Sequence, residues 1–454
     1  MRRQARVRFA PSPTGPLHIG SARTALFNYI YAKQNHGAFI LRFEDTDISR
    51  NQKVFEENIL AGLKWLGIIA DETYYQSKRQ EIYKSYLQKL VDKNLTYEHD
   101  GGIYFRLPTE SRKIIVDDII RGKIEFSSED FDDLVLFKKD GTPTFHFANV
   151  VDDIDMNITH VIRGEDHLSN TPRQILLYEA FAAKLPKFAH LPLILNPDRT
   201  KMSKRAGDVD LDEYIRAGYL PEAIINFLAQ LGWAPSAPSG VGGGKTGKEF
   251  FTLAELLQTF ELERVQKGGA VFDIGRLNHL NHHYLMQKPL EEYIKLAEPH
   301  LGVIPSLSRH SREGGNPDNK NQNLLRSALK LVQDRAQTLS EIPGLIDFFF
   351  ALPDYQRDLL VFKKSSPEQT AKGLNTALKV LETVSDKDWA QSKLQQILDE
   401  AIAAESLQPG DLFWPVRVAL SGRDASPSPV ELLEALGKAE SITRIKTAIN
   451  KMGD

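Results

Sequence analysis

The first fifty residues change their hydrophobic period twice. Residues 6–10 alternate as a short strand does, whereas residues 20–34 repeat apolar side chains every three or four positions, which predicts a helix. Gly37 is well placed to end that helix, and the apolar run 38–43 is typical of a buried strand. Together these elements predict the opening unit of a doubly wound α/β sheet.

The two periods continue to alternate as far as about residue 206, so the sheet is predicted to be interrupted and then completed. The predicted elements are helices at 52–66 and 78–94, an α+β insertion with a turn at Asp140-Gly141 over 97–155, a strand at 158–163, a helix that begins at Asn170 or Thr171 with Pro172 in its first turn and runs to about Ala183, and a strand at 190–195.

Helical spacing dominates the chain beyond residue 206. Two segments, 234–248 and 306–322, are rich in Gly, Pro, Ser and Asn and poor in apolar residues, so we expect them to lie at the surface. The predicted chain is therefore an α/β part followed by an all-α part.

Composition narrows the function. The 454 residues suggest about three domains. The 57 basic and 60 acidic residues nearly cancel, which neither requires nor excludes a nucleic-acid partner. There is no cysteine, which excludes disulfides, a thiol nucleophile, iron–sulfur clusters and cysteine-ligated zinc.

The sequence carries no recognisable targeting signal. No apolar run approaches the roughly 20 residues that span a bilayer, and Pro11, Pro13 and Pro16 stand where a signal peptide would be apolar. We expect an untargeted, cytoplasmic protein with no membrane contact.

The loop of residues 11–21, PSPTGPLHIGS, connects a predicted strand to a predicted helix. A helix N-terminus presents unpaired N–H groups and partial positive charge, which suits a phosphate. Gly15 and Gly20 would let a ligand approach the backbone, and His18 offers a hydrogen-bond donor. Taken alone, such a loop is more often a structural turn.

The segment 196–207, NPDRTKMSKRAG, directly follows a predicted strand. Lys201, Lys204 and Arg205 place positive charge in a loop without apolar periodicity, as a clamp on a polyphosphate requires. A solvated basic turn is the alternative if the segment is considered by itself.

The two segments together resemble the HIGH and KMSKS signatures of class I aminoacyl-tRNA synthetases. The chain is more closely similar to bacterial-type glutamyl-tRNA synthetases, through RFAPSPTGPLHIGSARTALFNYIYAK, LRFEDTD, FANVVDDIDMNITHVIRGEDHLSNTPRQ, KMSKR and the C-terminal PVRVALSG. Glutaminyl enzymes typically have Pro-Glu-Pro-Asn-Gly where this chain has Pro-Ser-Pro-Thr-Gly. The resemblance covers nearly the whole chain.

The resemblance implies roles for particular residues. It assigns ATP binding to Pro11, Ser12, Gly15, His18, Gly20, Lys201, Met202, Ser203, Lys204 and Arg205, with His18, Lys201 and Lys204 catalytic. It assigns glutamate binding to Arg8, Ala10, Ser12, Glu44, Phe145, Asn149 and Arg163. Within the second set, we expect Arg8 and Arg163 to anchor carboxylates, and Ser12 and Glu44 to lie near the ammonium. A surface ion pair is the alternative for Arg8 and Glu44.

The resemblance also implies a fold and a domain order. We expect a Rossmann-type catalytic domain split by an insertion, followed by helical domains. The implied regions are the first catalytic half (1–90), an acceptor-binding insertion (91–155), the second catalytic half with the KMSKR loop (156–205), a helical stem-contact region (206–295) and a helical anticodon-binding domain (296–454).

The implied reaction uses ATP as a substrate with Mg²⁺, activates L-glutamate and charges tRNA(Glu). Charging of tRNA(Gln) stays open, as do the anticodon-reading residues and the roles of 234–248 and 306–322. The family expectation is a monomer, and we expect no protein-held metal and no zinc.

Two other functions remain alternatives. One is a nucleotidyltransferase that adenylates a small acid without tRNA, against which the long helical C-terminal part argues. The other is an inactive relative that serves as an RNA-binding module, against which the intact His18, Lys201, Lys204 and Arg163 argue.

Overall fold

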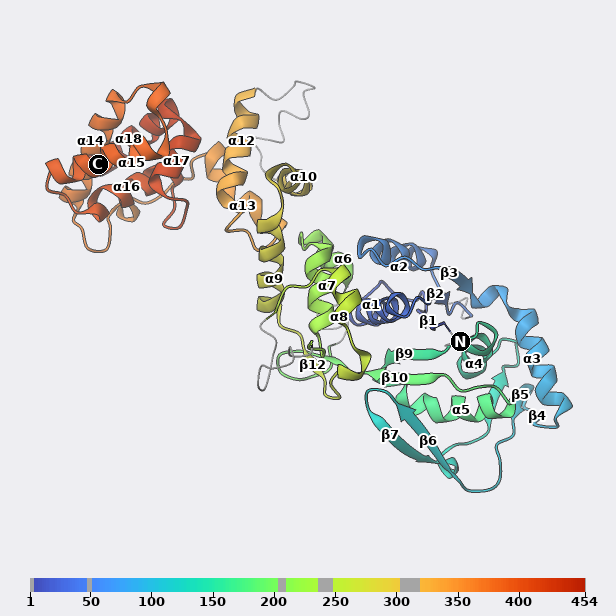
Figure 1. Ribbon diagram of the computed structural model, residues 1–454. Helices are drawn as coiled ribbons and strands as arrows, with labels where there is room; N and C mark the ends of the chain where they lie inside the picture. The colour runs from blue at the N-terminus through green and yellow to red at the C-terminus, as the bar shows by residue number, and fades with distance from the viewer. Residues whose placement is uncertain (1–3, 47–50, 203–209, 236–247, 303–318, 454) are drawn as a thin grey trace. The chain divides into compact units, whose positions relative to one another are not determined.

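The chain divides into two units, residues 1–281 and 282–454. A computed structural model describes residues 4–46, 51–202, 210–235, 248–302 and 319–453 (Figure 1). Helix α9 (Ile274–Gln287) carries the boundary between the units.

Unit 1 combines strands and helices in the order that the sequence predicts for an α/β fold. Its strands are β1 (Arg6–Phe9), β2 (Ala38–Phe43), β3 (Glu72–Tyr75), β4 (Thr96–His99), β5 (Gly102–Phe105), β6 (Lys113–Asp118), β7 (Gly122–Ser127), β8 (Leu134–Phe137), β9 (His160–Gly164), β10 (Lys187–Leu191), β11 (Ile194–Leu195) and β12 (Ala270–Val271). Its helices before α9 are α1 (Ile19–Gln34), α2 (Lys53–Trp65), α3 (Gln80–Asp92), α4 (Phe145–Asp155), α5 (Thr171–Ala180), α6 (Leu211–Arg216), α7 (Pro221–Gln230) and α8 (Leu253–Thr259).

Two groups of parallel strands form the centre of unit 1. Strands β1, β2 and β3 pair in parallel, and β9 pairs in parallel with β10, which pairs with β6. The Thr159 amide donates to the Arg6 carbonyl oxygen at 2.9 Å, so β1 and β9 lie side by side (Figure 1). The parallel strands therefore end at a shared carboxyl edge, where ligands bind in doubly wound folds.

Side chains on these strands alternate between two apolar layers. Phe9, Leu41 and Ile162 pack with α1, α2 and α7, whereas Ile40 and Val161 pack with α3, α4 and α5. Because neighbouring residues of a strand face opposite sides, Arg8, Arg42 and Arg163 are directed to the α4 and α5 side. The strand period thus collects three arginines on one face of the sheet.

The insertion is joined to the sheet through the β6–β7 hairpin. Strands β6 and β7 are antiparallel from Lys113↔Ser127 to Asp118↔Gly122, and Asp118 is in register with Phe188 of β10. The Ile119 amide donates to the Phe188 carbonyl oxygen at 2.8 Å. The turn of this hairpin consequently lies beside the carboxyl half of β10.

Two sequence predictions at element ends differ from the structure. The strand predicted at 190–195 is two strands, β10 and β11, because Pro192 interrupts the run and has no N–H to donate. The left-handed residue after α1 is His36, with φ of 47°, instead of Gly37. Gly37 is needed for another reason, since a Cβ there would lie 2.0 Å from the Ala5 carbonyl oxygen.

The helix predicted near Asn170 is α5, which begins at Thr171 with Pro172 in its first turn and ends at Ala180, a few residues early. Asn170 occupies the N-cap position, but its side chain makes no capping hydrogen bond, because a 3-10 helix, Glu165–Asn170, leads directly into α5. The sequence predicted only an α+β insertion over 97–155 and did not identify helix α4 within it. Asp152 and Asp153, which face the arginines, interrupt the apolar face of α4, so its helical periodicity is hard to recognise in the sequence.

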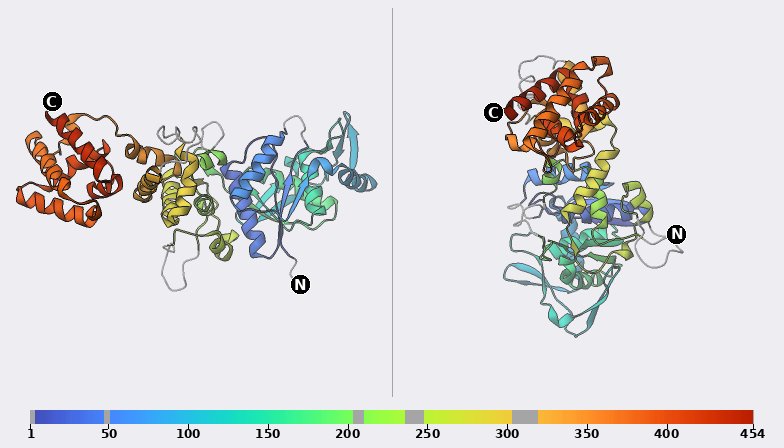
Figure 2. Two further views of the ribbon diagram at one scale, coloured as in Figure 1. Left: turned by 90° about the horizontal axis from the view of Figure 1, so that it is seen from above. Right: turned by 90° about the vertical axis from the view of Figure 1, so that its left-hand side faces the viewer.

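Every element in the described part of unit 2 is a helix (Figure 2). These helices are α10 (Leu290–Leu301), α12 (Asn319–Val332), α13 (Ile342–Phe350), α14 (Pro367–Thr383), α15 (Gln391–Ala404), α16 (Pro409–Ser421), α17 (Pro429–Leu436) and α18 (Lys438–Gly453). The polar segment predicted at 306–322 therefore ends inside α12, while 303–318 and 236–247 lie outside the described residues. Among the helices that the structure describes, none is long and apolar enough to cross a membrane.

Candidate active site

A cavity of about 730 Å³ lies at the carboxyl ends of β1, β2, β9 and β10. A volume of this size suits a small-molecule ligand. All the described residues that the sequence predicted for the site line this cavity: Arg8, Ala10, Pro11, Ser12, Gly15, His18, Gly20, Glu44, Phe145, Asn149, Arg163, Lys201 and Met202. The other three predicted residues, Ser203, Lys204 and Arg205, lie outside the described part of the chain.

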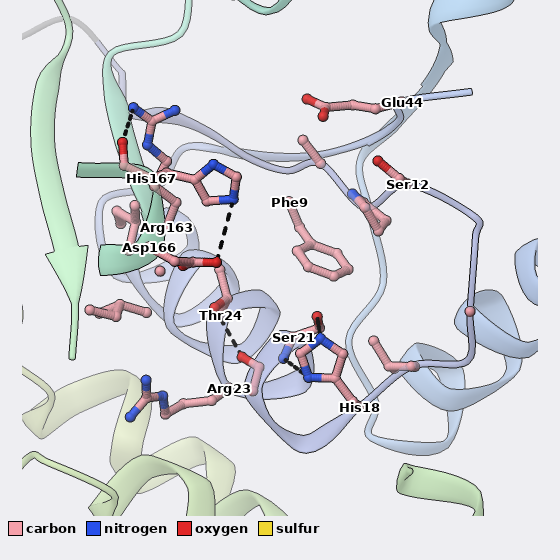
Figure 3. A pocket seen from close by; sticks show the side chains of 18 of the residues that line it. Phe9, Ser12, His18, Ser21, Arg23, Thr24, Glu44, Arg163, Asp166 and His167 are labelled. Carbon is pink, nitrogen blue, oxygen red and sulfur yellow. Dashed lines mark hydrogen bonds and ion pairs between the residues drawn. The ribbon is translucent and has the colours of Figure 1, made fainter. Parts of the chain in front are cut away.

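The loop before α1 forms one wall of the cavity and contributes Ser12 and His18 (Figure 3). His18 is the N-cap of α1, and its Nδ1 accepts a hydrogen bond from the Ser21 amide at 3.2 Å. The Leu17 amide donates to Asn58 Oδ1 of α2 at 2.8 Å, which fixes the loop from outside. Because the first turn of α1 has no acidic residue, its amides and partial positive charge suit an anion.

Lys201 and Met202 reach the cavity from a tight turn after β11. The Asn196 amide donates to the Thr200 carbonyl oxygen at 2.8 Å, and Arg199 takes a left-handed φ of 67°. The Met202 amide then donates to the Ile194 carbonyl oxygen at 3.1 Å. The turn thereby returns an exposed lysine to the lining of the cavity.

Arg163, at the end of β9, is a buried cation held by neutral groups. Its Nη2 donates to Gln174 Oε1 at 2.7 Å and to Thr171 Oγ1 at 2.9 Å, and its Nε donates to His190 Nε2 at 3.2 Å. Burial, together with the positive charge of Arg8, lowers the pKa of the guanidinium to about 10. An anionic ligand in the cavity would stabilise this charge.

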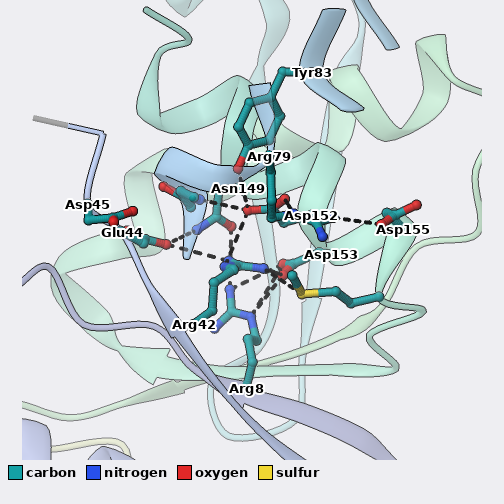
Figure 4. A network of polar contacts seen from close by, with 12 residues as sticks. Arg8, Arg42, Glu44, Asp45, Arg79, Tyr83, Asn149, Asp152, Asp153 and Asp155 are labelled. Atoms are coloured by element: carbon teal, nitrogen blue, oxygen red, sulfur yellow. Dashed lines mark hydrogen bonds and ion pairs between the residues drawn. The ribbon is translucent and has the colours of Figure 1, made fainter. Parts of the chain in front are cut away.

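Arg8 and Arg42 share the carboxylate of Asp153 (Figure 4). Arg8 Nε lies 3.1 Å from Asp153 Oδ1, and Arg42 Nη1 lies 2.6 Å from the same oxygen. Burial alone would raise the pKa of Asp153, but the two guanidinium groups outweigh burial and hold it below its usual value. Asp153 therefore stays charged and fixes the orientation of Arg8 at the cavity wall.

A second acidic centre beside Asp153 completes the network. Asp152 accepts hydrogen bonds from Arg79 Nε at 2.7 Å, Gln76 Nε2 at 2.8 Å and Tyr83 Oη at 3.0 Å. Its carboxylate also lies 3.6 Å from Arg42 Nε. Such buried charges persist only when they are paired, so the network is tightly specified.

Glu44 is the carboxylate that faces the cavity from the end of β2. Its Oε1 accepts a hydrogen bond from Asn149 Nδ2 at 2.7 Å and lies 3.5 Å from Arg42 Nη2. Burial raises the pKa of Glu44, even though Arg42 and Arg8 oppose the rise. A cationic group of a ligand would favour its charged form.

The sequence reasoning missed the supporting residues Arg42, Asp152 and Asp153. Their signal was present, because an arginine inside the apolar run of β2 and two aspartates inside an apolar helix must have buried partners. It also missed Asp166 and His167, which line the cavity after β9. Burial and the charge of Arg163 lower the pKa of His167 to about 4, so His167 adds no positive charge to the cavity near neutral pH.

The geometry gives the cavity two chemically different ends. One end has two buried guanidinium groups, Arg8 and Arg163, together with the carboxylate of Glu44. The other end has the N-terminus of α1 with His18 (Figure 3), and Lys201 also lines the cavity. The first end suits a zwitterion with an additional carboxylate, and the second suits a polyphosphate.

Comparisons with known proteins agree with this arrangement. Residues 4–101 and 98–279 match the family model described as tRNA synthetases class I (E and Q), catalytic domain, and residues 292–449 match an anticodon binding domain. The chain is 37% identical over 505 residues to the glutamate–tRNA ligase of Carboxydothermus hydrogenoformans, covering 98% of this chain and all of that protein. It is also 36% identical over 488 residues to the glutamate–tRNA ligase of Thermodesulfovibrio yellowstonii, covering 98% of this chain and 99% of the relative.

Solved structures give the same result. A glutamate–tRNA ligase from Elizabethkingia meningosepticum, crystallised in complex with its amino acid, superposes with a TM-score of 0.83 at 32% identity over 99% of both chains. The glutamate–tRNA synthetase of Elizabethkingia anophelis superposes with a TM-score of 0.82, also at 32% identity, over 99% of this chain. The chain therefore belongs to the glutamate–tRNA ligase family of class I aminoacyl-tRNA synthetases.

Proposed function

We propose that the chain activates L-glutamate with ATP and transfers the glutamyl group to the 3′-terminal adenosine of tRNA(Glu). The observation that carries this proposal is the placement of Arg8 and Arg163, both buried, on the same cavity as the acidic Glu44. Glutamate has two carboxylates and one ammonium, and this wall offers two cations and one anion to bind them.

The proposed reaction has two steps and needs no protein nucleophile. An α-carboxylate oxygen of glutamate attacks the α-phosphorus of ATP, the bond to the bridging oxygen of the β-phosphate breaks, and pyrophosphate leaves. A terminal ribose hydroxyl of tRNA then attacks the acyl carbon, loses its proton, and displaces AMP. Catalysis rests on orientation and on stabilising negative charge at the transferring phosphorus.

The residues at the phosphate end have distinct proposed roles. The amides at the start of α1 and the side chain of His18 would bind the ATP phosphates, and their helix position supports this role. Lys201, with Lys204, would neutralise the β- and γ-phosphates. Ser12 lines the cavity on the side of Glu44, which supports its proposed contact with the ammonium (Figure 3).

We propose that Mg²⁺ enters as part of the ATP substrate. The described residues contain no group of three or more His, Asp or Glu side chains suited to hold a metal. Mg²⁺ commonly keeps most of its water and binds substrate phosphates, so a dedicated protein cage is not required. The ion would offset phosphate charge, and Lys201 would do the same from the protein side.

The tRNA partner would be bound by local basic surfaces, because the whole chain carries a net charge of only −3. Binding should therefore weaken steeply as salt rises. The match of residues 292–449 to an anticodon binding domain supports a tRNA substrate. We propose a monomer that works in the cytoplasm, where tRNA is charged for translation, with tRNA(Gln) as an open second substrate.

Charging purified tRNA(Glu) and tRNA(Gln) side by side with labelled glutamate tests the proposal. We expect ATP-dependent charging of tRNA(Glu), and the second lane decides whether tRNA(Gln) is also used. In parallel, Arg163→Leu should impair the use of glutamate far more than that of ATP. Charging of tRNA with glutamine, or a folded wild-type protein that charges neither tRNA with glutamate, would contradict the proposal.

A further inference from the structure

A line of buried polar groups runs from the β6–β7 hairpin to Arg163. Asp118 ends β6, His190 lies on β10 and Arg163 lies on β9. Asp118 Oδ2 is 2.7 Å from His190 Nδ1, and His190 Nε2 accepts from Arg163 Nε at 3.2 Å. The three residues are 3%, 0% and 6% exposed, so water does not compete for these bonds.

The contacts determine the tautomer of His190. Arg163 Nε always carries a proton, so it needs the unprotonated lone pair of His190 Nε2. The ring proton must then be on Nδ1, where it is donated to Asp118. Burial lowers the pKa of His190, although Asp118 opposes the change, which favours the neutral ring that accepts the hydrogen bond from Arg163.

Asp118 has no acceptor position to spare in this arrangement. Its Oδ2 also accepts the His190 amide at 3.0 Å, while its Oδ1 accepts the amides of Ile120 at 3.0 Å and Arg121 at 2.9 Å. Both oxygens must therefore be acceptors. The carboxylate at once closes the hairpin turn and orients the imidazole.

The hairpin turn has a second attachment near the cavity. The Arg121 guanidinium forms an ion pair with Glu165, which follows β9 directly. Glu165 Oε1 also accepts the Leu193 amide at 2.7 Å, and Leu193 lines the cavity. The turn is thus seated on the ends of both strands that carry Arg163 and His190.

We propose that Asp118 and His190 are positioning residues for Arg163, and that through them the seating of the β6–β7 hairpin sets the geometry of the amino-acid site. This inference rests on the proposed role of Arg163 as a carboxylate anchor. Neither Asp118 nor His190 is among the residues that line the cavity, so both act through Arg163. A fixed guanidinium binds a carboxylate in one orientation, whereas a loosened one does not.

The test is the Asp118→Asn variant, which keeps the size of the side chain but introduces an N–H where an acceptor is needed. If the introduced amide donates to His190 Nδ1, the ring proton must move to Nε2, where it would face the N–H of Arg163 Nε. We expect the KM for glutamate to rise roughly tenfold to a hundredfold, with kcat and the KM for ATP nearly unchanged. Steady-state aminoacylation with each substrate varied in turn measures these quantities.

Two further variants separate positioning from folding. His190→Gln offers one acceptor and one donor in a neutral side chain, so it should recover part of the loss seen in His190→Leu. Asp133→Asn is the matched control within the insertion, because Asp133 also accepts a backbone amide, that of Leu107 at 2.7 Å, and a side-chain donor, Tyr97 Oη at 2.8 Å. It should leave the KM for glutamate unchanged.

The outcomes distinguish this inference from the proposed function. If Arg163→Leu impairs glutamate use and Asp118→Asn leaves the KM for glutamate unchanged, the positioning role is wrong while the anchor stands. A fall in kcat alone in Asp118→Asn would indicate loss of folded enzyme and would also contradict the inference. If Arg163→Leu uses glutamate normally, the proposed anchor itself is wrong.

Discussion

The side-chain amide of Asn149 donates a hydrogen bond to Glu44 Oε1 at 2.7 Å and so connects helix α4 to the end of strand β2 at the cavity wall. Asn149 Oδ1 also lies 3.4 Å from Arg8 Nη2. One amide therefore touches both the acidic and the basic group that we assign to glutamate. Its two ends satisfy two opposite charges, which an aspartate could not do.

Asn149→Asp should lower kcat/KM for glutamate by roughly tenfold or more, because a second carboxylate beside buried Glu44 disfavours the charge on both. Aminoacylation at saturating ATP and tRNA measures the effect. Asn375→Asp, at an exposed position of α14, is a control for the added negative charge and should behave as wild type. Equal efficiency in Asn149→Asp would remove Glu44 from the proposed site.

Arg42→Met should destabilise unit 1 by about 3 to 5 kcal/mol, because it leaves the buried Asp152 and Asp153 with one cationic partner fewer each. Urea unfolding followed in the transition of unit 1 measures the loss. Arg112→Met breaks an exposed ion pair with Glu179 and should cost no more than about 1 kcal/mol. Similar losses in both variants would show that the network contributes little.

Gly20→Ala should slow formation of the adenylate roughly tenfold while leaving the fold intact. A Cβ at this position would lie 3.2 Å from both Nδ1 and Cε1 of His18, so the imidazole must shift by a few tenths of an ångström. Pyrophosphate exchange in the presence of tRNA follows this step. Gly344→Ala, whose Cβ would meet no atom within 4 Å, provides the control, and an unaltered rate in Gly20→Ala would mean that the His18 position is not critical.

His160 should make unit 1 less stable as the pH falls. Burial, together with Lys187, lowers its pKa to about 4, whereas an unfolded histidine titrates near about 6.5. Between these values the unfolded state binds a proton that the folded state excludes, so stability is lost as the pH falls from 6.5 towards 4.

The variant His160→Gln removes this loss together with the hydrogen bond between Tyr31 Oη and His160 Nε2. We expect wild type to be the more stable protein at pH 7.5, and the difference in free energy of unfolding to narrow at pH 5. Between pH 7.5 and 8 the difference in free energy of unfolding between wild type and His160→Gln should stay constant. A difference that is the same at pH 5 and pH 7.5 would contradict the assigned pKa.

The site residues that the sequence suggests could be named because they belong to short continuous motifs. The loop 11–21 and the strand–helix pattern around it specify the α1 N-terminus locally, and these residues meet Arg163 and Lys201 at the shared strand edge. The supporting layer was harder to predict. The two aspartates that pair with Arg42 are more than a hundred residues away on α4, and periodicity does not reveal such pairs.

Element ends were missed for local physical reasons. His36 takes a left-handed φ although a glycine follows it, because Gly37 is required where the chain passes the Ala5 carbonyl oxygen. Pro192 divides a continuous apolar run into two strands, and its carbonyl oxygen accepts a hydrogen bond from Arg23. In both cases a tertiary contact decided between two locally acceptable conformations.

The alternation along β1 has a consequence for how this enzyme family can change. Val7 and Phe9 belong to the apolar layer, while Arg8, between them, reaches the amino-acid site. Deleting one residue from this strand would exchange the two sides, sending an arginine into the core and a phenylalanine into the cavity. Such a deletion would impair glutamate binding and folding at the same time. Insertions and deletions should therefore be tolerated in the connecting loops and purged from the strand.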